Sequence, residues 1–166
     1  MNKIPRRILR LQEELIALRH DLHAHPELGF EEQRTASIVA GWLKRHGLEV
    51  RAGVAGTGVV GTLRGEAGEG TVVGFRADMD ALPVEEQSDL PYRSQHPGKM
   101  HACGHDGHTT ILLGAAAVLA ELRTQLRGAV RFYFQPAEEG VSGAKAMLAE
   151  GVLQEMPPRW VVALHG

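Results

Sequence analysis

Four short segments of the chain gather side chains that can bind metal ions or move protons. The four segments read Arg76-Ala77-Asp78-Met79-Asp80, His101-Ala102-Cys103-Gly104-His105-Asp106-Gly107-His108, Gln135-Pro136-Ala137-Glu138-Glu139-Gly140 and Leu164-His165. Three of the nine histidines of the chain fall within residues 101–108. Thiolate, imidazole and carboxylate groups together form a ligand set that suits zinc, manganese or a related first-row metal.

The spacing inside two of these segments favours hydrolytic chemistry. Cys103 and His105 are separated by one glycine, and glycines let the backbone come close to an ion, so this loop can direct a thiolate and an imidazole at one point. Glu138 and Glu139 provide two adjacent carboxylates with no basic neighbour in sequence. One carboxylate can bind a metal ion, while the other accepts a proton from activated water.

Each segment also has a simpler structural explanation. An isolated Asp-x-Asp or His-Asp pair is usually a helix cap or a surface feature, and Glu-Glu before glycine is more often a solvated turn. Cys103 could be an inert buried thiol, or a nucleophile with His105 or His108 as its base. The histidines near the end of the first predicted helix are expected to pack or to cap: His20, His23 and His25. Only the combination of several such segments favours the metal site.

The elements that must position these segments can be predicted from apolar spacing. Apolar residues at three- and four-residue steps from Ile8 to Leu22 predict an amphipathic helix that ends near His25-Pro26. A second helix is predicted over residues 32–46, with Gly47 as its stop. Strand-like runs follow at residues 48–54, 59–65 and 71–77, and residues 65–70 are predicted to form a hairpin loop between the last two strands.

The second half of the chain continues the alternation of helices and strands. Residues 81–100 show no clear period and are predicted to be a surface loop near the site. A third helix is predicted to start near His108, with a core face that includes Ile111 and Leu112. A strand (129–135), a short helix (142–150) and a last strand (160–165) follow. This order predicts an α/β domain around a mixed sheet, with the four segments at the carboxyl ends of strands, where such sheets place their sites.

Composition limits the range of partners. The formal net charge of -2 gives no electrostatic reason to expect nucleic acid or an anionic membrane as a partner. The longest apolar runs are too short to span a bilayer, and the N-terminal residues do not have the pattern of a signal peptide. A single cysteine cannot form an internal disulfide. We therefore expect a cytoplasmic protein that binds neither nucleic acid nor membrane.

Several segments taken together resemble a known family. LHAHPELGFEE, RADMDALPVEE, MHACGHDGHTT, LLGAAAVL, FQPAEEG and the final ALH resemble the hippurate hydrolase and N-acyl-L-amino acid amidohydrolase branch of the aminoacylase-like dinuclear metallopeptidases. The resemblance extends over essentially all 166 residues. It implies a mixed-sheet, three-layer α/β/α catalytic domain of the zinc-exopeptidase type. It also implies a site for two divalent metal ions that hydrolyses the amide bond of N-acyl amino acids.

The resemblance also assigns expected roles to single residues. Cys103 is similar to the thiolate that bridges the two ions, and His105, Glu139 and His165 are similar to further ligands. Glu138 is similar to the general base, which activates water and then protonates the leaving amine. One ion would be bound by Cys103, His105 and His165. The other would be bound by Cys103, Glu139 and a histidine from near the C-terminus of the family members.

Two aspartates and the chain length differ from the pattern of the more distant relatives. Asp78 stands where those relatives have a ligand histidine, and Asp80 stands where they keep an aspartate beside the site, so we expect both to support the site from behind. Family members are more than twice as long, with an inserted lid domain used for dimerisation, and the intact proteins are expected to be homo-oligomers. Residues 1–166 are therefore expected to be the N-terminal part of a catalytic domain that is incomplete at its C-terminal end.

The expected incompleteness of the catalytic domain should affect metal binding, hydrolysis and association of the 166-residue chain. Without the lid domain and the later part of the catalytic domain, we expect about one tightly bound metal ion and impaired hydrolysis. A metal-binding but inactive fragment, or a thiol hydrolase that uses Cys103, are the alternatives. We also expect exposed apolar surface and a tendency to associate.

Overall fold

The computed structural model describes residues 6–140 and 142–165. In chain order its elements are α1 (Arg6–Ala24), α2 (Gln33–Arg45), β1 (Glu49–Val54), β2 (Gly58–Arg64), β3 (Val72–Asp78), α3 (His105–Glu121), the short 3-10 helix η1 (Arg123–Gln125), β4 (Ala129–Gln135), α4 (Gly143–Ala149) and β5 (Trp160–Ala163). Each helix and strand predicted from the sequence is present within a few residues of its predicted place. Residues 1–5, 141 and 166 lie outside the described residues.

The five strands form one mixed sheet in the order β1-β2-β4-β3-β5. β2 pairs antiparallel with β1 and β4, whereas β3 pairs parallel with both β4 and β5. Asp78 at the end of β3 pairs with Gln135 at the end of β4, and Arg76 pairs with Ala163 of β5. The three parallel strands therefore end together at one edge of the sheet, which brings three of the four chemical segments to the same place.

The predicted hairpin loop at residues 65–70 is wrong. β2 and β3 are not neighbours, because β4 lies between them. The segment instead passes the start of β4, where the backbone N–H of Gly65 donates to the carbonyl of Gly128. The actual hairpin joins β1 to β2, and its turn contains Ala55 and Gly56, both with positive φ. Two apolar strands joined by a glycine-rich loop look alike in sequence whether or not a third strand separates them.

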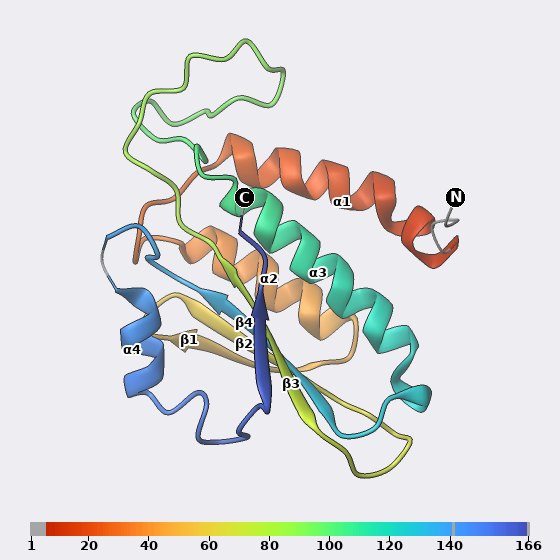
Figure 1. Ribbon diagram of the computed structural model, residues 1–166. Helices are drawn as coiled ribbons and strands as arrows, with labels where there is room; N and C mark the ends of the chain where they lie inside the picture. The colour runs from red at the N-terminus through yellow and green to blue at the C-terminus, as the bar shows by residue number, and fades with distance from the viewer. Residues whose placement is uncertain (1–5, 141, 166) are drawn as a thin grey trace.

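Helices cover both faces of the sheet, as Figure 1 shows. Val59, Leu63, Phe132 and Phe134 pack with residues of α2 and α3 in the main core cluster. Val60 and Tyr133, which alternate with them along the same strands, pack with Met147 of α4 in a smaller cluster. This alternation gives the predicted three-layer α/β/α arrangement and confirms the fold class.

The helices largely follow the predicted pattern, with two differences in α3. The predicted inward face of α2 (Ala36, Val39, Trp42 and Leu43) is buried, and Gly47 with φ 75° follows its end. α3 begins at His105 rather than near His108, after Gly104 in the left-handed region. Its buried face includes Leu113, while Ile111, which was predicted to face the core, is 55% exposed. The apolar residues of α3 surround the helix too evenly to fix its orientation from sequence.

Residues 81–100 form the predicted loop, with only isolated bridges such as that between Leu82 and Met100. Figure 1 shows the loop extending beyond the end of α1. Within the part of the chain that the structure describes, none of the helices has the length and apolar character needed to cross a membrane.

Candidate metal centre

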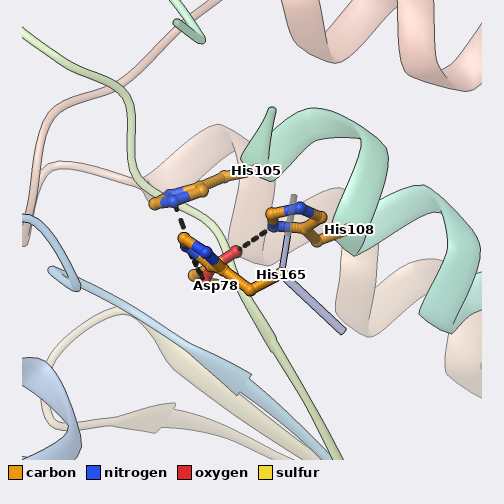
Figure 2. A group of neighbouring side chains, drawn as sticks. All are labelled: Asp78, His105, His108 and His165. Carbon is orange, nitrogen blue, oxygen red and sulfur yellow. Dashed lines mark hydrogen bonds and ion pairs between the residues drawn. The ribbon is translucent and has the colours of Figure 1, made fainter. Parts of the chain in front are cut away.

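The chemical segments meet where β3, β4 and β5 end beside the first turn of α3. His105 and His108 are three residues apart on this helix and so lie on the same face. Figure 2 shows them around Asp78 together with His165. Nδ1 of His108 lies 2.7 Å from Oδ1 of Asp78. Nε2 of His105 and Nε2 of His165 each lie 3.7 Å from Oδ2 of the same carboxylate.

A second group of side chains adjoins His105. Its Nε2 lies 3.8 Å from Oε1 of Glu139 and 3.9 Å from Oε2 of Glu138. Sγ of Cys103 lies 3.8 Å from Nε2 of His165. Ligand atoms of Cys103, His105 and Glu139 all lie within 4.8 Å of one another. The structure thus brings together all five residues for which the sequence predicts a role in metal binding or catalysis.

His105 is held so that one ring nitrogen faces this group. Its Nδ1 lies 2.8 Å from the backbone carbonyl of Asp80, and because a carbonyl only accepts, Nδ1 carries the proton and donates. In the neutral ring Nε2 then has the lone pair, and it is buried without a hydrogen-bond partner among the described residues. Burial alone would lower the pKa of His105, but Asp80 and Asp78 outweigh it and raise the pKa above its ordinary value. An unpaired buried nitrogen between two carboxylates and a thiol is suited to a cation.

The charge around Cys103 also fits a metal ion. Burial raises the pKa of the Cys103 thiol, and the neighbouring carboxylates Glu139, Asp78 and Glu138 raise it further. In the absence of a cation the thiolate is disfavoured, which argues against Cys103 as a free nucleophile. A divalent ion would reverse this effect because it deprotonates a coordinating thiol outright. The residues present therefore fit the metal that the sequence predicts.

Asp78 and His108 form a neighbouring set that the sequence did not assign as ligands. Asp78, His105, His108 and His165 offer ligand atoms within 4.8 Å of one another. Arg76 places Nη1 2.7 Å from Oδ2 of Asp78, so this carboxylate already pairs with Arg76 and His108. The three-residue spacing of His105 and His108 was the available signal. It was missed because the helix was predicted to begin at His108 rather than at His105.

Asp80 supports the group from the side of the sheet. Its Oδ2 accepts a hydrogen bond from the backbone N–H of Glu139, with an N–O distance of 2.9 Å. Burial alone would raise the pKa of Asp80, but hydrogen bonds from His105 and from the backbone N–H groups of Glu139 and Glu138 outweigh it and lower the pKa. Asp80 therefore fixes both an imidazole and the turn that carries the two glutamates.

The three histidines near the end of α1, which were predicted to pack or to cap, make contacts of these kinds. His20 stacks on Tyr92 with ring centroids 3.7 Å apart. Nδ1 of His25 donates to the carbonyl of Asp21 in the last turn of α1. His23 is buried and hydrogen-bonds to Asp106 and Glu86.

A mixed α/β sheet with thiol, imidazole and carboxylate groups gathered at its parallel strand ends is the arrangement expected of a metallopeptidase. The sequence pattern of peptidase family M20/M25/M40 matches residues 74–166, and the chain belongs to this family. It is 50% identical over 165 residues to the hippurate hydrolase of Campylobacter jejuni, covering 99% of this chain and 42% of the relative. It is 44% identical to the N-acetyl-L-cysteine deacetylase of Bacillus subtilis, covering 97% of this chain and 38% of the relative.

A solved structure matches the fold closely. The crystal structure of the Bacillus subtilis YXEP protein, described as a dinuclear metal binding peptidase from the M20 family, superposes with a TM-score of 0.89 at 42% identity. The match covers 95% of this chain and 44% of that one. The expected resemblance is confirmed, and the chain spans about two fifths of the length of the curated relatives it matches.

Proposed function

We propose that the chain forms part of a metal-dependent amidohydrolase that cleaves the amide bond of N-acyl amino acids such as hippurate. The observation that carries the proposal is the buried, unpaired Nε2 of His105, which faces Cys103, Glu139 and His165. The names of the relatives support the substrate class, because hippurate hydrolase and N-acetyl-L-cysteine deacetylase both denote enzymes of N-acyl amino acids.

The proposed metal ligands are Cys103, His105, Glu139 and His165. The alternative set with Asp78 and His108 is less favoured, because these two side chains are hydrogen-bonded to each other and Asp78 also pairs with Arg76. Divalent zinc or manganese, two ions in an intact site, would supply Lewis acidity and lower the pKa of water. Cys103, His105 and His165 would offer three ligands to one ion, whereas a second ion would have only Cys103 and Glu139 among the described residues, so we expect about one tightly held ion for the 166-residue chain.

Glu138 is proposed as the general base. Its carboxylate is one-third exposed and lies 3.9 Å from Nε2 of His105, at the edge of the ligand group. From there it can accept the proton of an attacking water and then donate it to the leaving amine, so that one residue serves both proton transfers. Its neighbour Glu139 faces the same nitrogen and is the proposed ligand.

Residues 1–166 are further proposed to be the N-terminal part of a catalytic domain. The support is the length of the relatives, of which this chain covers 42% and 38%. In intact proteins of this kind, a lid and dimerisation domain and the remainder of the catalytic domain would complete the substrate pocket and the homo-oligomer. A cytoplasmic location and a small-molecule partner, without nucleic acid or membrane, complete the proposal.

Metal content and hydrolysis measured on one sample test this function. Elemental analysis of the purified chain should find about one bound divalent ion, and N-benzoylglycine should be hydrolysed weakly and only without chelator. Glu138→Gln should keep the metal and abolish this residual turnover, whereas Cys103→Ala should lose most of the metal. Bound metal without turnover would support a binding role alone. A parent chain that binds no divalent ion, or activity that resists chelators but not thiol alkylation, would overturn the proposal.

A further inference from the structure

The two glutamates of the site lie in a turn that has an unfavourable backbone conformation. This turn, residues 136–140, connects β4 to the segment before α4. Its Ala137 has φ 48°, in the left-handed region that non-glycine residues rarely adopt. Ala137 is also fully buried. Such a conformation persists only where the surroundings hold it in place.

One of the groups that hold Ala137 is a buried carboxylate from the other end of the chain. Oε1 of Glu32 accepts a hydrogen bond from the backbone N–H of Ala137, at an N–O distance of 2.8 Å. Oε2 of Glu32 accepts one from the hydroxyl of Thr57 at 2.5 Å. Glu32 is completely buried, and no salt bridge to it is found among the described residues. A carboxylate buried without a cation is costly, and these two hydrogen bonds offset part of that cost.

The local explanation for Glu32 does not hold. Glu32 occupies the N-cap position of α2, where a carboxylate would normally accept from the first backbone N–H groups of the helix, but its side chain makes no capping bond. Glu27 performs that task instead and accepts from the backbone N–H groups of Arg34 and Thr35. The side chain of Glu32 is thus directed away from its own helix and toward the turn.

The turn is held on both sides of Glu138. Glu32 binds the N–H of Ala137 on one side, and Asp80 binds the N–H of Glu139 on the other. Two buried carboxylates therefore fix the residues before and after the proposed base. Because Asp80 also touches His105, Glu32 is the one of these two carboxylates that acts on the turn without direct contact with the ligand group.

We propose that Glu32 is a positioning residue for the metal centre. Its hydrogen bond to Ala137 keeps the turn in its left-handed conformation, and this conformation directs Glu138 and Glu139 toward His105. The inference rests on the proposed function for the roles of the two glutamates. It assigns a task to the PELGFEE segment, which lies more than 100 residues before the turn in sequence.

The test compares Glu32 with a matched carboxylate of the same segment. Glu32→Ala removes the bond to the turn, and Glu32→Gln retains an oxygen that can accept from Ala137. Glu27→Ala is the control, because it removes a carboxylate that binds backbone amides without touching the turn. Each variant of the 166-residue chain is titrated with Co²⁺ alone after its folding has been checked by circular dichroism, and amide hydrogen exchange is measured at Ala137 and Glu139.

Glu32→Ala should weaken Co²⁺ binding by about 10–100-fold, the usual effect of losing a residue that orients a ligand. It should also speed exchange at Ala137, whereas Glu32→Gln should restore both properties. If the alanine variant does not fold, Glu32→Asp, whose shorter side chain cannot reach both Thr57 and Ala137, should show the same losses. Unchanged Co²⁺ affinity and exchange in Glu32→Ala, or an equal loss of affinity in Glu27→Ala, would overturn the inference. A parent chain that does not bind Co²⁺ would refute the proposed function, while exchange at Ala137 would still decide whether Glu32 holds the turn.

Discussion

His101 lies beside the metal centre as a buried imidazole with both ring nitrogens unpaired among the described residues. Its side chain is 4% exposed. Burial lowers the pKa of His101 to about 4, although Asp106 favours the charged form. A histidine that must remain neutral in the folded state makes that state sensitive to acid.

We predict that the chelated protein loses stability as the pH falls from 6.5 through 4. In this window the unfolded chain binds a proton at His101 and the folded chain does not, so the unfolded state is favoured increasingly as protons are added. Relative to neutral pH, protonation of His101 in the unfolded chain lowers the free energy of unfolding by about 3 kcal/mol at pH 4. Urea unfolding at pH 8 and pH 4.5 should show a smaller loss for His101→Phe than for the parent. Equal losses in the two proteins would contradict the prediction.

Residue type and spacing were sufficient to identify Cys103, His105 and one of the two adjacent glutamates as candidate ligands, because few structural roles call for these groups together; the choice of Glu139 came from the family resemblance. The same reasoning could not find the part played by Glu32. Its partner Ala137 is 105 residues away and contributes only a backbone N–H. A hydrogen bond to backbone leaves no signature in the sequence of the partner, so contacts of this kind become visible only in three dimensions.

At the scale of elements, the two differently exposed faces of α3 lead to a direct prediction. Leu113 is 0% exposed, whereas Ile111 is 55% exposed on the same helix. Leu113→Ala should therefore lower the free energy of unfolding by about 2–5 kcal/mol. Ile111→Ala should change it by less than about 0.5 kcal/mol. Urea unfolding of both variants measures the difference, and a similar cost at both positions would mean that α3 packs with another face.

The positions of the helices and strands in the sequence were easier to predict than the pairing of the strands in the sheet. β4 was located residue for residue, because its apolar run AVRFYFQ is bounded by Gly128 and Pro136. Its central place between β2 and β3 could not be predicted, since it depends on α3 crossing one face of the sheet before the chain returns. Local patterns specify that a strand exists, but pairing depends on which apolar faces the helices leave available.

The whole molecule has two unlike sheet edges. At the β1 edge, Arg51 forms ion pairs with Glu150 and Glu155, and Glu49 pairs with Arg64. Charged side chains of this kind discourage contact between sheets. At the other edge, β5 pairs with β3 and with no further strand among residues 6–140 and 142–165. The side chains of β5 and its continuation are apolar and exposed: Trp160, Val161, Val162 and Leu164.

We therefore predict that the chain associates through the β5 edge as its concentration rises, because unpaired backbone groups and apolar side chains occur there together. Val162→Lys should reduce this association by placing a charge on the edge. Ile111→Lys, at an exposed apolar position on α3, is the matched control and should have little effect. Sedimentation velocity over a range of concentrations would measure it, and a parent chain that remains monomeric throughout would refute the prediction.

The hydrogen bonds that hold the Glu-Glu turn also bear on the order in which the molecule assembles. They join residues 105 and 59 positions apart, and contacts between distant residues form only after the entropy of closing long loops has been overcome. Cys103 and His105 lie close together in any conformation of the chain, whereas Glu139 joins them only when β4 has entered the sheet. During folding, an ion would first meet two ligands and later the complete set. The strength of metal binding at the proposed site would therefore report how far folding has progressed.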